Sequence, residues 1–311
     1  LDNDCSLGAD DGLATSTWYD DDDADGWGAA AVVDCAQPAG TVDNDYDCDD
    51  TDATVVPGGH EDCAWDSCLG LLDDGIATSD GDYWIDFAGT PTETECDMTT
   101  DGGGWGLLIR YQDGDPCPGD WQAATPRGCS RPAAGGASQS AVVRAPPYSF
   151  TQLRGVVRAL GFGGSDAFRD AGATLDDAYV DGMTITVGSP RRHVFTFAHG
   201  VSDTFGNGGA ASCPCEGGSA PPAFVGADYL CEEPHASADV GGGNRRYDET
   251  DPLFDGQTIA DATCIGAPES SPDFSVNLGL ATTDSVELRL QHTEGSTNED
   301  TAVIGLELWV R

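Results

Sequence analysis

A short acidic segment near the start of the chain has the residue types and spacing of half a calcium-binding loop. Asp21, Asp23 and Asp25 place carboxylates at alternate positions, and Gly26 follows them directly. Oxygen ligands at the first, third and fifth positions wrap around a hard cation, and glycine permits the sharp turn that comes next. The carbonyl of Trp27 is placed to complete this arc. The segment therefore predicts a Ca2+ site.

This loop departs from the EF-hand pattern. An EF-hand carries a bidentate glutamate at its twelfth position, whereas Val32 stands at that position here and Asp34 follows two residues later. We therefore expect a calcium site of another type, with Asp34 as a further candidate ligand. The alternative is a solvated acidic spacer that holds no specific ion.

The charge of the chain restricts its partners. Among 311 residues there are 55 acidic and 13 basic side chains, which gives a formal net charge of −42, and every basic residue is an arginine. Chemistry that needs a lysine, such as a Schiff base or a phosphate-loop lysine, is excluded in this chain. Nucleic acid is not an expected partner, because its binding requires clustered cations. Divalent metal ions or high salt are the expected counterions.

The cysteines indicate an oxidising compartment. There are twelve of them, an even number, and none has zinc-finger spacing, so we expect six disulfides and a secreted, extracellular protein. No stretch is apolar enough to insert into a membrane, and no signal peptide stands at Leu1. We expect a mature product whose export signal has been removed.

Motifs of the common enzyme classes are missing from the sequence. It contains no GxSxG nucleophile elbow, no HExxH metal motif and no phosphate-binding glycine loop. Its five histidines are scattered. We therefore predict a protein that is not an enzyme.

The composition changes near position 66. Residues 1–66 contain no lysine or arginine and show little apolar periodicity, so this Asp-rich region needs metal ions and disulfides to offset its ordering entropy. Residues 67–311 consist of short β-like runs between Gly, Pro and Asp turns. The sequence thus predicts two regions, 1–66 and 67–311.

The second region reads as an α+β fold with much irregular loop, short antiparallel sheets and few helices. A helix is expected over 68–77. Val180-Asp-Gly-Met183 predicts a hairpin between strands at 177–180 and 183–187. Alternation predicts three more strands, at 193–198, 286–290 and 304–310. The last two of these are expected to pair, with residues 292–301 as the loop between them.

One decapeptide carries a resemblance to known proteins. Cys68, a short amphipathic stretch and the strand-like Tyr83-Trp-Ile-Asp-Phe87 precede the sequence Cys96-Asp-Met-Thr-Thr-Asp-Gly-Gly-Gly-Trp105. This order resembles the opening of fibrinogen-related domains and of intelectin-type lectins. The resemblance implies a Cys68–Cys96 disulfide and extracellular recognition. Later segments, from LRGVVRALGFGGSDAF to NEDTAVIGLELWVR, resemble secreted proteins of cnidarians and sponges with the same opening.

The lectin resemblance also suggests a second calcium site. Asn298-Glu299 aligns by position with an Asn-Glu pair that helps to hold the sugar-binding calcium of intelectin-like lectins, and Asp300 adds an oxygen. In those lectins a His-containing segment beyond the position of Arg311 completes the site. The pair here must therefore use ligands from elsewhere to bind a sugar. The alternatives are a structural calcium ion and a solvated loop.

The Asp-rich region resembles a metal-binding repeat of secreted bacterial proteins, notably myxobacterial ones. The matching segments are TWYDDDDADGWG, DCAQPAGTV and DYDCDDTDATVVPGGHEDC, and LDNDC at residues 1–5 is close to the string that announces the next unit. The chain is therefore expected to begin inside a preceding unit of a longer precursor. The resemblance implies disulfides Cys35–Cys48 and Cys5–Cys63. It adds five candidate calcium ligands: Asp45, Asp47, Asp49, Asp50 and Asp52.

The remaining cysteines leave one pairing open. Cys117–Cys129 is expected to close a local loop, and Cys213 and Cys215 to pair with Cys231 and Cys264 in an order that the sequence does not assign.

The acidic loop, the cysteines and the two resemblances together predict a secreted, calcium-binding recognition or adhesion protein. It is expected to be lectin-like, with a glycan or another cell-surface ligand as its partner. The alternative is a structural subunit that assembles with calcium and copies of itself into an extracellular filament, sheath or matrix.

Overall fold

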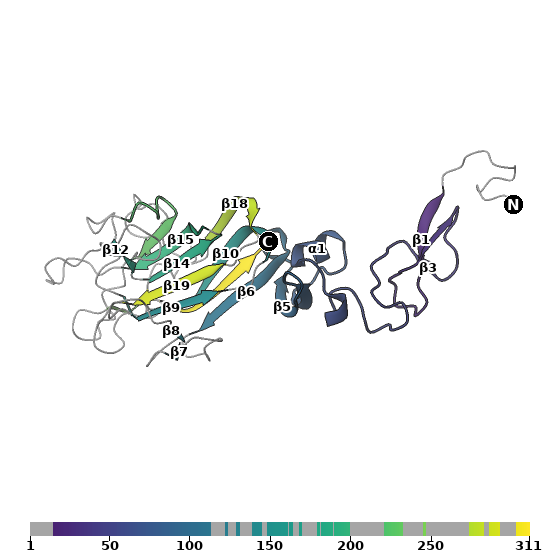
Figure 1. The fold of residues 1–311 in the computed structure, drawn as a ribbon, viewed down its shortest axis with the longest axis horizontal. Coiled ribbons are helices and arrows are strands. Elements are labelled where there is room, and N and C mark those ends of the chain that lie inside the picture. Colours follow the sequence, from purple (N-terminus) through teal and green to yellow (C-terminus); the bar gives the residue numbers. More distant parts are fainter. Residues whose placement is uncertain are drawn as a thin grey trace. The chain divides into compact units, whose positions relative to one another are not determined.

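The structure is a computed structural model of the chain, and it describes one long segment and a series of shorter ones. These are residues 15–112, 122–123, 129–130, 139–144, 148–160, 162–163, 168–169, 179–180, 182–188, 190–199, 221–232, 245–246, 274–282, 286–292 and 303–311. The described residues are mostly β-sheet with few helices and many loops (Figure 1). Among them, no helix is long and apolar enough to cross a membrane.

The chain divides into two compact units. Unit 1 comprises Leu1–Gly106 together with Arg311, and unit 2 comprises Leu107–Val310. Strand β6 (Trp105–Gln112) begins in unit 1 and continues in unit 2.

The described elements of unit 1 are short. They are β1 (Ser16–Asp20), β2 (Ala31–Asp34), β3 (Thr41–Val42), the 3-10 turn η1 (Glu61–Cys63), helix α1 (Cys68–Asp73), β4 (Gly81–Asp86), β5 (Pro91–Asp97), the 3-10 turn η2 (Thr100–Gly102) and the start of β6. β1 lies between β2 and β3 in an antiparallel sheet. β5 pairs with β4 on one side and with the first residues of β6 on the other.

The predicted boundary between residues 66 and 67 falls inside unit 1. Trp65 donates its backbone N–H to the carbonyl of Trp84, at 2.9 Å, and its own carbonyl accepts from the N–H of Asp86, at 2.8 Å. Both partners are on β4. The end of the Asp-rich region therefore continues the hydrogen bonding of the β4 strand.

Helix α1 is shorter than the predicted 68–77. It begins where the side chain of Ser67 accepts from the N–H of Gly70, at 2.9 Å, and it ends at Asp73. Gly75 follows with a φ of +73°, a left-handed conformation that stops helices. The helix still buries Leu71 completely.

The disulfides of unit 1 agree with the predictions in one case and correct them in two. Cys68 is joined to Cys96, the pairing that the fibrinogen-like opening implies. Cys48 is joined to Cys63, so the predicted pairs Cys35–Cys48 and Cys5–Cys63 are wrong. The chain between Cys48 and Cys63 turns back on itself, which brings their Cα atoms to 5.6 Å. Cys35 is also disulfide-bonded, and its partner lies outside the described residues.

The three glycines before Trp105 form a turn that packs directly on neighbouring backbone. A β-carbon at Gly103 would lie 2.1 Å from the carbonyl oxygen of Met98, and one at Gly104 would lie 2.8 Å from the Cα of Leu69 on helix α1. Trp105 is only 1% exposed, and its indole N–H donates to the carbonyl of Thr100, at 3.1 Å. The motif thus closes the core of unit 1 around its tryptophan.

Unit 2 is built from strands in the part of it that the structure describes. After β6 these are β7 (Gln122–Ala123), β8 (Cys129–Ser130), β9 (Gln139–Arg144), β10 (Phe150–Leu160), β11 (Phe162–Gly163), β12 (Phe168–Arg169), β13 (Tyr179–Val180), β14 (Gly182–Val187), β15 (Arg192–His199), β16 (Tyr229–Glu232), β17 (Arg245–Arg246), β18 (Phe274–Thr282), β19 (Glu287–His292) and β20 (Val303–Val310).

Two larger sheets dominate unit 2. Within unit 2 one follows the strand order β18-β10-β20-β6 and the other the order β16-β15-β14-β19-β9, in which the β15–β16 pair is parallel. The rings of Phe195 on β15 and Phe274 on β18 are stacked with centroids 4.0 Å apart, which joins a strand of each sheet. Leu153, Ile185 and Leu288 are completely buried.

Two predicted strand pairings are wrong. The hairpin across 177–187 does not form, because β13 pairs with β12 while β14 pairs with β15 and β19. The strands at 286–290 and 304–310 exist as β19 and β20 but lie in different sheets. Each sequence pattern indicated a strand correctly, yet alternation alone carries no information about a strand's partner.

Two acidic side chains that alternate with leucines on β19 and β20 are buried. Glu287 is 3% exposed and lies 3.4 Å from Arg191, and Glu307 is 8% exposed and lies 2.9 Å from Arg110. Because an arginine reaches each carboxylate, these strands can be covered on both faces without leaving a buried charge unpaired.

Candidate metal centre

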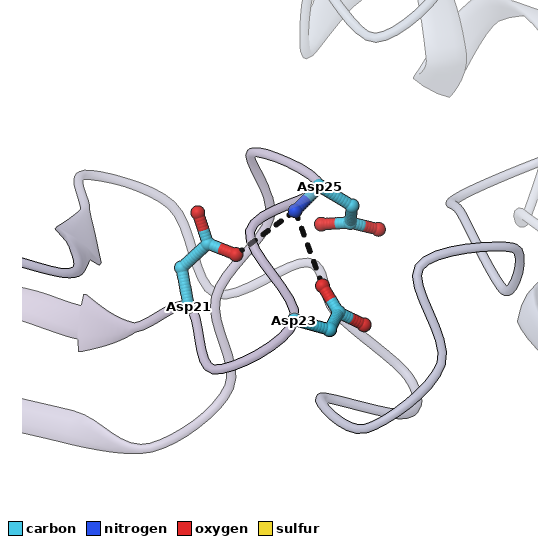
Figure 2. A group of neighbouring side chains, drawn as sticks. All are labelled: Asp21, Asp23 and Asp25. Carbon is cyan, nitrogen blue, oxygen red and sulfur yellow. Dashed lines mark hydrogen bonds between the residues drawn. The ribbon is translucent and has the colours of Figure 1, made fainter.

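The loop after β1 gathers three carboxylates around its own backbone. The N–H of Asp25 donates to Oδ1 of Asp21 and to Oδ1 of Asp23, both at 3.1 Å (Figure 2). The N–H of Trp27 donates to Oδ1 of Asp25, at 2.8 Å. Gly26 has a φ of +99°, which turns the chain back toward β2. The alternation of aspartates therefore produces a tight loop in which each carboxylate is held by a backbone donor.

The three carboxylates lie close together and keep a free oxygen. Asp21, Asp23 and Asp25 each offer an oxygen within 4.8 Å of the others. The Oδ2 atoms of Asp23 and Asp25 are shielded from solvent, and no described residue donates a hydrogen bond to them. Shielded carboxylate oxygens normally have a partner, because burying an unpaired charge is costly. These atoms have the chemistry and the placement of cation ligands.

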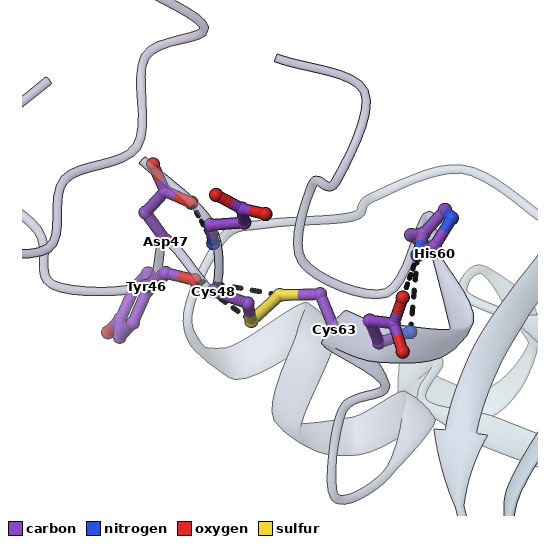
Figure 3. Close-up of a disulfide and its surroundings, with 7 residues drawn as sticks. Tyr46, Asp47, Cys48, His60 and Cys63 are labelled. Atoms are coloured by element: carbon purple, nitrogen blue, oxygen red, sulfur yellow. Dashed lines mark hydrogen bonds and ion pairs between the residues drawn. A yellow bond between two sulfur atoms is a disulfide. The ribbon is translucent and has the colours of Figure 1, made fainter. Parts of the chain in front are cut away.

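A second segment approaches this loop from further along the chain. The N–H of Asp47 donates to the carbonyl of Gly28, at 3.1 Å, and the N–H of Asp22 donates to Oδ1 of Asp50, at 2.7 Å. Oδ1 of Asp47 accepts from the N–H of Asp49, at 2.8 Å, and its Oδ2 is shielded without a donor among the described residues (Figure 3). Asp47 thus repeats the arrangement found at Asp23 and Asp25.

Electrostatics show that these carboxylates affect one another. The pKa of Asp23 is raised first by loss of solvation and then by the charges of Asp25, Asp21 and Asp50, while a backbone hydrogen bond opposes the shift. The pKa of Asp47 is raised in the same way, by loss of solvation and then by the charges of Asp25, Asp23 and Asp50. Negative charge is therefore crowded at this point of the chain, and a cation would relieve that crowding.

The donor set fits a hard divalent cation. Carboxylate and carbonyl oxygens suit Ca2+ or Mg2+, whereas sites for zinc or copper draw on imidazole or thiolate, and this cluster contains neither. The backbone N–H groups that hold each Oδ1 fix the orientation of the carboxylates, as outer-shell hydrogen bonds do in metal sites. Asp21, Asp23 and Asp25 would hold the ion, with Asp47 and Asp50 as neighbours.

Other predicted ligands lie on exposed turns. Asp34 accepts from the N–H of Cys35, at 2.6 Å, Asp49 accepts from the hydroxyl of Thr51, at 2.7 Å, and Asp52 accepts from the hydroxyl of Thr54, at 2.7 Å. The Thr54 bonds lower the pKa of Asp52. These carboxylates stabilise local turns.

Five predicted ligands remain: Asp45, Trp27, Asn298, Glu299 and Asp300. Asp45 is exposed, and its charge helps to raise the pKa of the neighbouring Tyr46. Trp27 contributes the N–H described above. Asn298, Glu299 and Asp300 lie outside the described residues, as do the side chains needed for Cys117–Cys129 and for the four later cysteines.

Sequence reasoning missed one polar residue that shapes the centre. The side chain of Asn44 accepts from the N–H of Gly28, at 3.3 Å, and donates to the carbonyl of Gly26, at 3.2 Å. It lies among aspartates in the order Asp43-Asn44-Asp45, and an amide in an acidic run was the available signal, since an amide can both donate and accept whereas an ionised carboxylate only accepts.

A row of aromatic rings also escaped the sequence reading. Tyr46 lies between Trp27, with ring centroids 6.2 Å apart, and Trp65, at 5.1 Å in an edge-to-face arrangement. The charge of Asp74 is the largest cause of the raised pKa of Tyr46, followed by loss of solvation. The spacing of these aromatics in the sequence follows no period, so no pattern could indicate the row.

His60 has a structural role beside the Cys48–Cys63 disulfide. Its Nδ1 accepts from the N–H of Asp62, at 3.2 Å, and caps the start of η1 (Figure 3).

Comparison of the chain with models of protein families, with curated proteins and with solved structures finds no match.

Proposed function

We propose that the chain is a secreted, calcium-binding protein that acts in recognition or adhesion and is not an enzyme. The loop of Asp21, Asp23 and Asp25 holds the ion, and the region from residue 67 onward recognises a glycan or another cell-surface ligand. The observation that supports the calcium site best is the pair of shielded, unpartnered Oδ2 atoms on Asp23 and Asp25 within a group of carboxylates less than 4.8 Å apart.

The recognition function is supported by the sequence resemblance and by the fibrinogen-like opening. That opening has the Cys68–Cys96 disulfide, and its glycine turn packs on helix α1. Disulfides favour an extracellular location. We assign the opening a scaffolding role, because its polar groups are used internally: Asp80 accepts from the N–H of Met98, at 2.7 Å.

A calorimetric titration with calcium tests the metal site. Wild-type protein is expected to bind calcium, and Asp23→Asn is expected to weaken binding by at least about tenfold, since losing one charged ligand costs well over 1.4 kcal/mol. Asp22→Asn is the matched control. It removes the same charge from the same loop at an exposed position, so it should change the affinity much less. Equal losses in both variants would show a general charge effect and no built site.

Two further readouts separate recognition from assembly. Binding to a glycan array that depends on calcium and is lost with a chelator supports the recognition function. Growth of ordered particles in calcium, measured by light scattering without glycan binding, would instead support a structural subunit that assembles with copies of itself. A monomer that binds calcium and no glycan or cell surface would contradict both.

A further inference from the structure

Two segments far apart in the chain are joined at the candidate metal centre. We call residues 21–28 the acidic loop and residues 44–50 the latch segment. Four hydrogen bonds join them. The side chain of Asn44 donates to the carbonyl of Gly26, at 3.2 Å, and accepts from the N–H of Gly28, at 3.3 Å. The N–H of Asp47 donates to the carbonyl of Gly28, at 3.1 Å, and the N–H of Asp22 donates to Oδ1 of Asp50, at 2.7 Å. The latch segment thus lies directly on the acidic loop.

These contacts bring like charges together. Docking places the shielded Oδ2 atom of Asp47 close enough to Asp23 and Asp25 for their charges to interact. Each hydrogen bond contributes only about 0.5–1.5 kcal/mol net, and partly exposed ones lie at the lower end. Like charges in shielded surroundings cost a similar amount or more. The balance between the docked and undocked segment therefore depends on whether the carboxylates are neutralised.

The latch segment also connects the acidic loop to the rest of unit 1. The ring of Tyr46 contacts the rings of Trp27 and Trp65, and its hydroxyl interacts electrostatically with Asp74, just after helix α1. Trp65 is held by backbone hydrogen bonds to β4, and the Cys48–Cys63 disulfide holds the end of the latch segment (Figure 3). A change at the acidic loop thus has a continuous path of contacts to β4.

We propose that residues 44–50 are a cation-dependent latch. With a divalent cation on the acidic loop, the latch segment closes, and Tyr46 is held between Trp27 and Trp65. Without the cation, repulsion from Asp23 and Asp25 lifts Asp47 and the latch segment away. This inference rests on the proposed metal site, and it adds that the ion controls the contact between the Asp-rich loop and the rest of unit 1.

Hydrogen–deuterium exchange of the full chain, in calcium and in chelator, tests the latch. Calcium is expected to slow exchange of the Asp47 and Asp22 amides by about tenfold or more, because both are donors in the docked contacts and even 1.4 kcal/mol of added closure is a factor of ten. Amides of the β14–β15 pair, which lie in unit 2, serve as the internal control, and their exchange should not change.

Two variants distinguish a latch from a simple ligand effect. Asn44→Ala removes two docking bonds and no charge, so it should still bind calcium while its Asp47 amide responds much less. Asp47→Asn removes the repulsion, so its latch segment should exchange slowly even in chelator. If calcium binds by calorimetry but leaves the exchange of residues 44–50 unchanged, the latch is wrong and the metal site stands. If no calcium binds, the proposed metal site and the latch both fail.

Discussion

Arg311 lies over the ring of Trp105, with its guanidinium carbon 4.5 Å from the ring centroid. Its Nη1 also donates to the carbonyls of Asp101 and Gly103, at 3.0 and 2.9 Å. One arginine therefore covers the buried tryptophan and satisfies two carbonyls of the glycine turn. A planar guanidinium suits both contacts, because it stacks on aromatic faces and donates in a fixed geometry.

Replacing this arginine should destabilise unit 1. We expect Arg311→Ala to lower its free energy of unfolding by about 1–2 kcal/mol, the sum of a partly exposed cation–π contact and two hydrogen bonds. Arg311→Lys should recover only part of the loss. Differential scanning calorimetry measures the effect, with Arg192→Ala as an exposed arginine control. If the melting curve of Arg311→Ala is the same as that of the wild type, the contact contributes nothing to stability.

The glycine turn offers a test in which crowding and backbone strain are separable. Gly103 and Gly89 both have left-handed φ angles, +72° and +87°, but a β-carbon meets the Met98 carbonyl only at Gly103. Gly89→Ala should cost about 1 kcal/mol from strain alone. Gly103→Ala should cost several kcal/mol more or prevent folding, because backbone atoms must move. Similar stability of the two variants, measured by chemical denaturation, would refute the close packing.

The Cys48–Cys63 disulfide can be tested by peptide mapping and by the stability lost when it is removed. Proteolysis without reduction should release these two cysteines in one linked fragment. The double variant Cys48→Ser, Cys63→Ser should be less stable by about 3 kcal/mol, the loss of loop-closure entropy for a loop of this length. Recovery of Cys35 linked to Cys48 would restore the pairing that the repeat resemblance implies.

His193 predicts that unit 2 loses stability in mild acid. Burial, opposed in part by the charge of Asp228, lowers its pKa to about 4. Because its unfolded pKa is near 6.5, the unfolded state binds the proton first as the pH falls. The stability that neutral His193 supports is therefore complete above about pH 6.5 and is lost as the pH falls toward about 4.

The test compares wild type with His193→Gln by thermal unfolding from neutral pH to about pH 4. Glutamine keeps a polar group near Thr196, to which the His193 ring is bonded at 2.8 Å, but it does not titrate. The difference in stability between the two proteins should shrink as the pH falls through this window. A difference that is constant with pH would mean that His193 does not titrate as its burial implies.

The sequence predicted the local features of this protein better than the contacts between segments that are distant in the chain. Alternate aspartates before Gly26 indicated the carboxylate loop, and alternation located β15, β19 and β20, because these features depend on residues close together in the chain. Strand partners could not be predicted, and β20 pairs with β10 instead of β19. The latch contacts of Asn44 and Tyr46 were also missed, since they join segments separated by turns of no fixed length.

Burial of polar groups was equally hard to foresee. Glu287 and Glu307 occupy positions that alternate with leucines, which is typical of a solvated face. Both are buried because Arg191 and Arg110 reach them. Arg191 is distant from Glu287 in the sequence, and Arg110 from Glu307, so only the folded sheets reveal the pairing.

The most direct test of the calcium site is the stability of unit 1 in calcium and in chelator, compared among wild type, Asp23→Asn and Asp22→Asn. Calcium at about a thousand times its dissociation constant should stabilise the wild-type unit by about 4 kcal/mol, because it binds only the folded loop. Asp22→Asn should keep most of this gain and Asp23→Asn should lose most of it. A melting temperature of wild-type unit 1 that is the same in calcium and in chelator would contradict a metal centre at Asp21, Asp23 and Asp25.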